Sequence, residues 1–344
     1  MRLLSSNRPI ELETEDRIGI MDKRRKILVT GGYGFIGGNF IRFLRDNFPD
    51  CYIVNVDKNG YASNKDYIKD LCNESIKLNL KDSLWLENIF LKHTVDSSDS
   101  FDYIFHFAAE SHVDNSISGP TEFVESNVLG TQNLLECYRR ISPSARFIHI
   151  STDEVYGHLG WNDDPFTENT PLAPRSPYSA SKASSDLLCL SYIETYGLDI
   201  TVTRCCNNFG PNQYKEKFIP TIINALKDDK KIPVYGDGAN VREWIHVHDH
   251  TLAVWSIATN GKPGVYNIGS GVEMTNLELV DILCKIFEKD MDHCVKFVRD
   301  RPGHDFRYAI DSSKLRKELC WDPLYNDIEK ELREYVEYFL NNGR

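Results

Sequence analysis

A glycine-rich turn near the N-terminus is the feature that most constrains the fold. The apolar run 26–30 leads into Gly31, Gly34 and Gly37, and a helix is expected over 39–48. Glycines spaced in this way allow a tight turn, a close approach of backbone to a pyrophosphate, and close helix–strand packing. The free N–H groups at the start of the helix then face the phosphates. The stretch therefore predicts a dinucleotide-binding unit.

An acidic residue follows at the expected place. Asp57 ends the next expected strand, 51–57. A carboxylate there accepts hydrogen bonds from the adenosine ribose and repels a 2′-phosphate, which favours NAD over NADP. A turn residue at a strand end is the alternative, and the preceding glycines make the cofactor role the better interpretation.

Strands and helices alternate through the first half of the chain. Further strands are expected over 75–80, 101–107, 146–150 and 200–204, and helices over 83–93 and 121–140. This alternation predicts a parallel, doubly wound α/β sheet. The small residues Ala108 and Ala109 follow the strand 101–107, where they leave room for a cofactor against the backbone.

Four residues with acid–base chemistry follow the expected strand 146–150. Asp153 and Glu154 lie where a parallel strand ends, which is the ligand side of an α/β sheet. Tyr178 and Lys182 are four residues apart and share a helix face. The lysine charge is expected to lower the phenol pKa from about 10. Together they suit removal of a proton with a hydride, followed by acid–base work on a neighbouring carbon.

Each of these motifs has a simpler explanation when taken alone. Adjacent acids after a strand are commonly a helix cap, and a Tyr–Lys pair on a helix is commonly a surface pair. Their occurrence together with the glycine turn is what favours a redox site.

Composition excludes several classes of protein. The 344 residues can bury a large core, and 41% of them are hydrophobic, which excludes a disordered chain. A net charge of −11 argues against nucleic-acid or membrane-surface partners. No apolar run is long enough to span a bilayer. Nine cysteines without framework spacing indicate reduced thiols and a cytoplasmic location.

The second half carries polar and cationic residues on separate expected turns. These are Asn207 in the turn 205–211, Lys217 at a helix start, Arg242 in a short strand over 241–247, Asn267, and Arg301. Loop residues that converge on one cleft can form an anion site, although surface salt bridging is the alternative for each cation alone. The segment 234–238 is expected to be another turn.

These motifs resemble those of the extended short-chain dehydrogenase/reductase superfamily, and within it the nucleotide-sugar 4,6-dehydratases. The resemblance runs from about residue 25 to nearly the end. It depends on the glycine turn and on the segments A-A-E-S-H-V-D, S-T-D-E-V-Y-G, Y-S-A-S-K, N-N-F-G-P, G-D-G-x-N-V-R-E-W, Y-N-I-G and R-P-G-H-D-x-R-Y. The Asp153–Glu154 pair distinguishes the dehydratases from related 4-epimerases and decarboxylases, which usually have small or hydroxyl residues there.

The resemblance implies dehydration of dTDP-glucose or UDP-glucose to the 4-keto-6-deoxy sugar. NAD takes hydride from C4 while Tyr178 takes the hydroxyl proton. Glu154 removes the C5 proton, Asp153 protonates the departing C6 hydroxyl, and hydride returns to C6. A UDP-sugar 4-epimerase or decarboxylase, and a non-catalytic NAD-binding scaffold, are the alternatives. The nucleobase and the final deoxysugar remain open.

The resemblance also implies binding residues and no metal site. The cofactor-binding set is Gly31, Gly34, Phe35, Ile36, Gly37, Asp57, Lys58, Asn79, Leu80, Ala108, Ala109, Tyr178 and Lys182. The substrate-binding set is Ser111, Thr152, Asn207, Lys217, Arg242, Asn267, Arg301 and His304. Asn79 departs from the family, which usually has an acid there to meet the adenine amino group; an amide oxygen can still accept that hydrogen bond.

Three parts are expected along the chain. Residues 1–24 form a flexible extension, 25–204 an NAD-binding Rossmann domain, and 205–344 a nucleotide-sugar-binding domain. The segment 240–262 is expected to pack back on the first domain. By resemblance, two copies form a homodimer through the helices 121–140 and 178–196.

Overall fold

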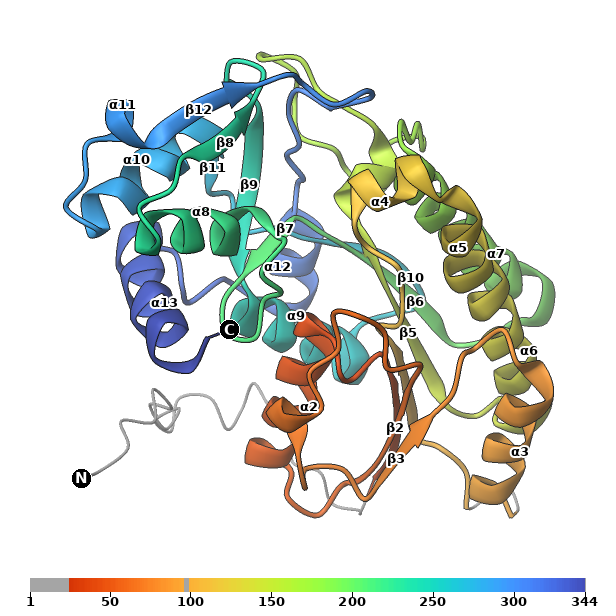
Figure 1. Ribbon diagram of the computed structural model, residues 1–344. Coiled ribbons are helices and arrows are strands. Elements are labelled where there is room, and N and C mark those ends of the chain that lie inside the picture. The colour runs from red at the N-terminus through yellow and green to blue at the C-terminus, as the bar shows by residue number, and fades with distance from the viewer. Residues whose placement is uncertain (1–24, 96–98, 344) are drawn as a thin grey trace.

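A parallel seven-stranded sheet forms the centre of the molecule (Figure 1). The computed structural model describes residues 25–95 and 99–343, so the expected extension 1–24 lies outside the described residues. The strand order is β3-β2-β1-β4-β5-β6-β10, and every neighbouring pair is parallel. The strands are β1 (Lys26–Thr30), β2 (Tyr52–Asp57), β3 (Glu74–Lys77), β4 (Tyr103–His106), β5 (Arg146–Thr152), β6 (Ile200–Cys205) and β10 (Gly264–Ile268). The order reverses between β1 and β4, and such a switch point is where doubly wound folds bind ligands.

Helices bury both faces of this sheet. Ile27 and Val29 of β1 belong to a core that includes α2 (Phe35–Asn47) and α9 (Val247–Asn260). Leu28 belongs to the opposite core, which includes α3 (Ser83–His93), α6 (Gly130–Ile141) and α7 (Pro177–Tyr196). A strand buried on both faces must be apolar throughout, which explains the uninterrupted hydrophobic run at the start of the fold.

Two expected helices differ in detail. α2 begins at Phe35, four residues earlier than expected, so Gly37 lies in its first turn. Only a glycine suits that position, because a Cβ on residue 37 would lie 2.5 Å from the Gly31 carbonyl oxygen. The helix expected over 121–140 is divided into α5 (Pro120–Phe123), the π-helical turn η2 (Val124–Leu129) and α6. Single π-turns inside helices are frequent at functional sites.

A smaller group of elements lies beside the sheet. Of the two expected turns, 205–211 is wrong in part because it contains β7 (Asn207–Phe209), and 234–238 is wrong only at its first two residues, which end β8 (Ile232–Tyr235). β7 pairs with β9 (Val241–His246), and β8 pairs with β12 (Val295–Val298). β11 (Glu273–Thr275) completes the β9 sheet. The partner strands are distant in sequence, so no local pattern reveals these pairings.

Helices complete this smaller part and cover the remaining surface. They are α8 (Phe218–Lys227), α10 (Asn276–Ile286), α11 (Met291–Cys294) and α13 (Ile328–Asn342). Short helices elsewhere are η1 (Asp66–Ile68), α4 (Val113–Ser118), η3 (Asp153–Tyr156) and α12 (Ser313–Leu319). Among the described residues, no helix combines the length and apolarity needed to cross a membrane.

The chain crosses between the two parts more than once. β10 is the edge strand of the main sheet, so the expected boundary at 204/205 is wrong for this segment. α9 contacts α2, and the ring of Trp255 lies 4.6 Å from that of Phe48. The two parts are therefore interleaved in sequence. The loops that follow the strands of the main sheet lie where the two parts meet.

Candidate active site

A cavity of about 370 Å³ lies between the two parts, at the carboxyl ends of the central strands. It gathers residues from the glycine turn, the ends of β2, β4 and β5, α7, and the segment after β6. Of the residues expected from the sequence, its lining includes Gly31, Gly34, Phe35, Ile36, Gly37, Asp57, Lys58, Ala108, Ala109, Ser111, Thr152, Glu154, Tyr178, Lys182, Asn207 and Lys217.

The glycine turn leaves space for a ligand against bare backbone. Gly31 has a φ of +77°, and a Cβ there would lie 2.6 Å from the backbone nitrogen of Ala108. Any side chain would push β1 and β4 apart at the switch point. Gly34 is the N-cap of α2 and supplies no side-chain hydrogen bond, so the first N–H groups of the helix are available to an anion. These features fit the pyrophosphate of a dinucleotide.

Asp57 is held rigidly at the edge of this cavity. One carboxylate oxygen accepts from the N–H of Asn59 at 2.7 Å, and the other accepts from the N–H of Tyr33 at 3.0 Å. Burial raises the pKa of Asp57, and these backbone donors oppose the rise. The carboxylate is therefore oriented before any ligand arrives.

The adjacent acids Asp153 and Glu154 have different surroundings. Both lie in η3, directly after β5. Asp153 is only 1% exposed; its Oδ1 accepts from the Thr152 hydroxyl at 3.1 Å, and its Oδ2 has no hydrogen-bond partner in the described residues. Burial, reinforced by the charge of Glu154, raises the pKa of Asp153 well above its usual value.

Glu154 lines the cavity. Burial raises the pKa of Glu154, but three nearby cations oppose the rise: Arg301, Arg242 and Lys217. Cations assist ionisation of Glu154, whereas the main neighbour of Asp153 is another carboxyl group. A proton shared by the two residues therefore resides on Asp153.

Tyr178 and Lys182 lie in the first two turns of α7. Pro177 at the first position and a capping box between Ser176 and Ser179 fix where this helix begins. The expectation that Lys182 lowers the phenol pKa is wrong for this structure. Burial, followed by the charge of Glu154, raises the pKa of Tyr178 well above 10.

The lysine ammonium is directed elsewhere. Nζ of Lys182 donates to the carbonyl of Ile150 at 2.8 Å and lies 3.4 Å from Nε2 of His149. Both groups lie on β5, behind the catalytic helix. The lysine is thus anchored to the sheet, and this explains why its charge does not determine the pKa of Tyr178.

Seven expected site residues are absent from the cavity lining: Asn79, Leu80, Asp153, Arg242, Asn267, Arg301 and His304. Leu80 is buried in the apolar core beneath α6. Asn79 lies beyond β3, where its side-chain oxygen accepts from the N–H of Lys81 at 3.2 Å. Asn267 is fully buried, and its amide bonds the Phe166 carbonyl and the Tyr156 hydroxyl.

The remaining cationic residues lie close to the cavity and are held by the protein. The Arg242 guanidinium stacks on Tyr308 at 4.4 Å and donates to the carbonyl of Asp305 at 2.9 Å. Arg301 pairs with Asp114 at 3.2 Å. His304 bonds Asp300 at 2.7 Å, and burial lowers the pKa of His304 to about 4.

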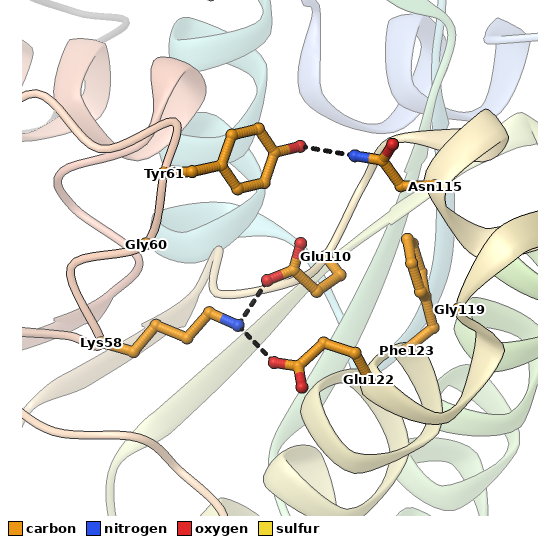
Figure 2. Close-up of a pocket in the computed structure, with 8 residues that line it drawn as sticks. All are labelled: Lys58, Gly60, Tyr61, Glu110, Asn115, Gly119, Glu122 and Phe123. Atoms are coloured by element: carbon orange, nitrogen blue, oxygen red, sulfur yellow. Dashed lines mark hydrogen bonds and ion pairs between the residues drawn. The ribbon is translucent and has the colours of Figure 1, made fainter.

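Several lining residues have no counterpart in the sequence-based set, including Tyr61, Ser63, Glu110, Ser126 and Gln213. Figure 2 shows the adjoining pocket, where Lys58 pairs with Glu110 and Glu122. Ser63 lies in the loop that follows Asp57, and its hydroxyl donates to the Asp57 carboxylate at 3.2 Å. Its closeness in sequence to Asp57 is therefore a local signal that could have identified it. Nothing local indicates Tyr61, which reaches Glu216 of the smaller part at 2.7 Å.

The fold and site define an extended short-chain dehydrogenase/reductase with added acid–base groups. A family model described as GDP-mannose 4,6 dehydratase matches residues 28–334, and the chain belongs to that family.

The similar proteins include dTDP-glucose 4,6-dehydratases and, at lower identity, a 4-epimerase. A dTDP-glucose 4,6-dehydratase of Neisseria meningitidis serogroup B is 44% identical, over 92% of this chain and 94% of its own length. The structure of DesIV, a dTDP-glucose 4,6-dehydratase of Streptomyces venezuelae with NAD and TYD bound, has a TM-score of 0.85 at 41% identity, covering 92% and 97% of the two chains. A UDP-glucose 4-epimerase of Thermotoga maritima shares the fold with a TM-score of 0.84 at 27% identity, covering 93% of this chain and all of its own.

Proposed function

We propose that this protein dehydrates dTDP-glucose to dTDP-4-keto-6-deoxyglucose, with NAD as a resident cofactor. The observation that carries the proposal is the pair Asp153–Glu154, with one acid on the cavity wall and the other buried behind it. An enzyme that only oxidises and reduces C4 has no use for two such carboxyl groups. The likeness to dTDP-glucose 4,6-dehydratases at 41–44% identity supports the same reaction.

The redox step uses Tyr178 and Lys182. Tyr178 takes the proton of the C4 hydroxyl, and Thr152, whose hydroxyl also bonds the phenol, holds the sugar oxygen. NAD supplies hydride acceptance at C4 and hydride donation at C6.

The elimination uses the two carboxyl groups. The 4-keto group acidifies the C5 hydrogen, which the Glu154 carboxylate removes as a proton. Asp153 protonates the C6 hydroxyl, the C6–O bond breaks, and water leaves. Glu154 returns its proton to C5 as C6 is reduced. Over the cycle, the proton taken by Tyr178 replaces the one that Asp153 gives up, so the net change is the loss of one water.

The binding roles are proposed from the resemblance and, for the residues that line it, from the cavity. We assign the glycine turn with Phe35 and Ile36 to the pyrophosphate, Asp57 and Lys58 to the adenosine ribose, and Asn79 and Leu80 to the adenine side. Ala108 and Ala109 lie against the cofactor. Ser111, Asn207 and Lys217 line the sugar-nucleotide side of the cavity. Arg242 and Arg301 supply the positive field for the diphosphate, the uncharged His304 lies near both arginines, and Asn267 supports them from the core.

The nucleobase is assigned from the relatives rather than from the cavity. dTDP-glucose and UDP-glucose differ by one methyl group, which is worth about 1 kcal/mol in a pocket. The test is a substrate panel of dTDP-, UDP-, GDP- and CDP-glucose with GDP-mannose, read by absorbance of the 4-keto product in alkali. Preferred turnover of dTDP-glucose is expected. Interconversion of glucose and galactose nucleotides without a 4-keto product would reassign the protein as an epimerase.

Assembly and location complete the proposal. Two lobes, an NAD-binding one and a nucleotide-sugar-binding one, enclose the cavity. A homodimer through η2 and α7 is supported by the exposed apolar side chains of Val124, Leu129 and Leu187 on these contacting elements. A cytoplasmic location is supported by the nine cysteines, all of which are free.

A further inference from the structure

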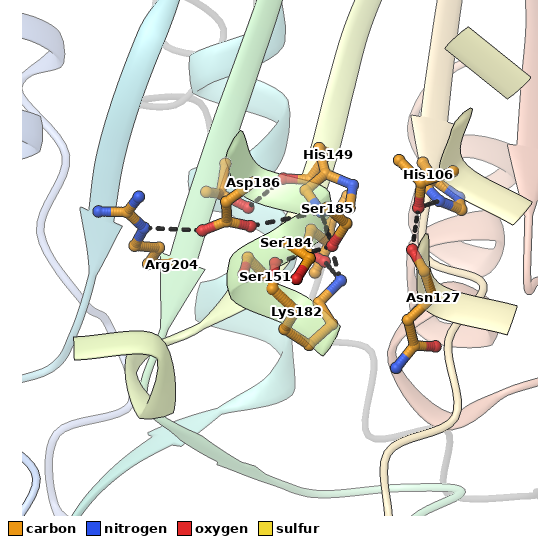
Figure 3. A network of polar contacts seen from close by, with 12 residues as sticks. His106, Asn127, His149, Ser151, Lys182, Ser184, Ser185, Asp186 and Arg204 are labelled. Atoms are coloured by element: carbon orange, nitrogen blue, oxygen red, sulfur yellow. Dashed lines mark hydrogen bonds and ion pairs between the residues drawn. The ribbon is translucent and has the colours of Figure 1, made fainter. Parts of the chain in front are cut away.

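A buried cluster of charged side chains lies behind the catalytic helix (Figure 3). We call it the rear cluster; it consists of Lys182, Asp186, His149 and Arg204. None of these residues is more than 3% exposed. They come from α7, β5 and β6, so the cluster fastens the catalytic helix to the sheet. The reaction proposed above uses Lys182 and leaves the other three without a role.

Asp186 lies at the centre of the rear cluster. It follows Lys182 by four residues, so both side chains lie on the same face of α7. Its Oδ2 accepts from Nε of Arg204 at 2.9 Å, and its Oδ1 lies 3.4 Å from Nε2 of His149. The same Nε2 is 3.4 Å from the Lys182 ammonium. The carboxylate therefore faces two cations, with an imidazole between it and the lysine.

The imidazole carries no charge at neutral pH. Burial and the charge of Lys182 lower the pKa of His149 to about 4. The rear cluster thus contains one anion between two cations. Arg204 is also fixed from its other side, because it donates to the Tyr156 hydroxyl at 2.9 Å.

Burial lowers the pKa of Lys182, and the charge of Asp186 is the largest influence opposing it. The other titratable groups that act on this lysine are thiols, whose pKa values burial raises, and imidazoles, whose pKa values burial lowers: Cys189, Cys205, His149 and His106. None of these groups supplies a negative charge at neutral pH. Asp186 is thus the counter-charge of the lysine.

We propose that Asp186 is a positioning residue that keeps Lys182 protonated and anchored on β5, and that Arg204 limits this effect by sharing the same carboxylate. The inference rests on the proposed function in one respect, namely that Lys182 takes part in the redox step. It predicts changes of opposite sign at two positions. Asp186→Asn leaves two buried cations facing each other, which favours release of the lysine proton. Arg204→Met leaves the carboxylate to the lysine alone, which favours its retention.

The direct test is the titration of Lys182, followed by NMR of protein carrying ¹³Cε-lysine and saturated with NAD. Lys182→Arg identifies the signal by its loss. Relative to the parent, the midpoint is expected to fall by about one pH unit in Asp186→Asn and to rise in Arg204→Met. Glu194→Gln removes an exposed charge from the same helix and serves as the matched control, with no change expected. Unchanged midpoints in both rear-cluster variants would overturn the proposal.

The second readout is the pH profile of C4 oxidation in a single turnover, followed by NADH absorbance. The alkaline limb should move to lower pH in Asp186→Asn and to higher pH in Arg204→Met, and Asp186→Glu should restore the parent profile. A uniform loss of rate at every pH would mean that Asp186 only supports the fold. If Asp186→Asn does not fold, Arg204→Met and Asp186→Glu decide the matter. If the parent oxidises no nucleotide sugar, the proposed function fails, while the NMR titration still tests the positioning role.

Discussion

Asp153 and Glu154 are neighbours in the chain, yet only Glu154 reaches the cavity, while Asp153 lies behind it at 1% exposure. The short helix η3 turns the two side chains in different directions. The cavity-facing acid is surrounded by cations, and the buried one by another carboxyl group. This arrangement favours ionisation of Glu154 over ionisation of Asp153, which is the order that an elimination requires.

The amide variants should therefore fail at different steps. Asp153→Asn is expected to oxidise C4 and exchange C5 hydrogen with solvent but to lose water at least about 100-fold more slowly. Glu154→Gln is expected to oxidise C4 with little exchange at C5. The measurement is a single turnover in deuterated water, with NADH absorbance and mass spectrometry of the sugar. Identical failure, with no transient NADH in either variant, would contradict this division of roles.

The phenol of Tyr178 should be indispensable for oxidation. Tyr178→Phe is expected to fold and to bind NAD but to lose at least about 100-fold in turnover, because nothing else takes the C4 hydroxyl proton. Tyr192→Phe is the matched control on the same helix, since its hydroxyl bonds Glu136 away from the cavity. Steady-state kinetics with dTDP-glucose compare the two. Equal activity of Tyr178→Phe and the parent would remove the tyrosine from the mechanism.

Asp57 should set the choice of dinucleotide. Its carboxylate is oriented by two backbone N–H groups, so Asp57→Asn changes charge with little change in size. The variant is expected to bind NAD about tenfold more weakly. Its affinities for NAD and NADP should differ less than those of the parent, because the repulsion of the 2′-phosphate is gone. Fluorescence titration of the cofactor-stripped protein with each dinucleotide measures this. A parent protein that binds both dinucleotides equally would show that Asp57 has no such role.

The sheet and the catalytic groups could be predicted because their signals are local. Alternating strands and helices, the glycine turn and the Tyr178–Lys182 spacing each occupy one short segment. β7 could not be predicted, because its partner β9 lies more than thirty residues further on. The direction of the Lys182 ammonium could not be predicted either. It depends on contacts with the Ile150 carbonyl and with His149, and sequence spacing does not reveal these contacts.

The same limit applies to binding residues whose surroundings depend on the fold. Asn267 was expected at the substrate because of its motif, but its amide completes hydrogen bonds inside the core. Tyr61 was not expected at all, because its importance comes from a contact with Glu216 across the cavity. Polar residues that meet across two interleaved parts are recognised only when the fold is known.

The exposed apolar side chains on η2 and α7 should mark the contact between two copies. Leu187, at 57% exposure on α7, is expected to be buried in a homodimer, so Leu187→Arg should yield monomers. Leu84→Arg introduces the same charge at another exposed leucine, which lies on α3 at 76% exposure, and is the control. Sedimentation velocity of the three proteins distinguishes the assemblies. A parent protein that is monomeric at micromolar concentration would exclude the dimer.

His250 should make the stability of the protein sensitive to acid. The side chain is fully buried on α9, with Nδ1 2.8 Å from the side-chain oxygen of Asn208, and burial lowers the pKa of His250 to about 3. The unfolded chain binds a proton at this histidine below about pH 6.5, whereas the folded chain does not. The neutral imidazole therefore contributes stability above pH 6.5 that is lost progressively as the pH falls towards 3.

The variant His250→Gln keeps a donor for Asn208 but cannot titrate. The parent is expected to be the more stable protein at neutral pH, and its advantage in free energy of unfolding should shrink by about 1.4 kcal/mol for each pH unit below about 6. Urea unfolding of both proteins at a series of pH values measures the difference, which cancels the titration of all other groups. His158→Gln, at an exposed position, controls for the loss of any histidine. A difference between parent and His250→Gln that stays constant from neutral to acid pH would show that His250 is protonated in the folded protein.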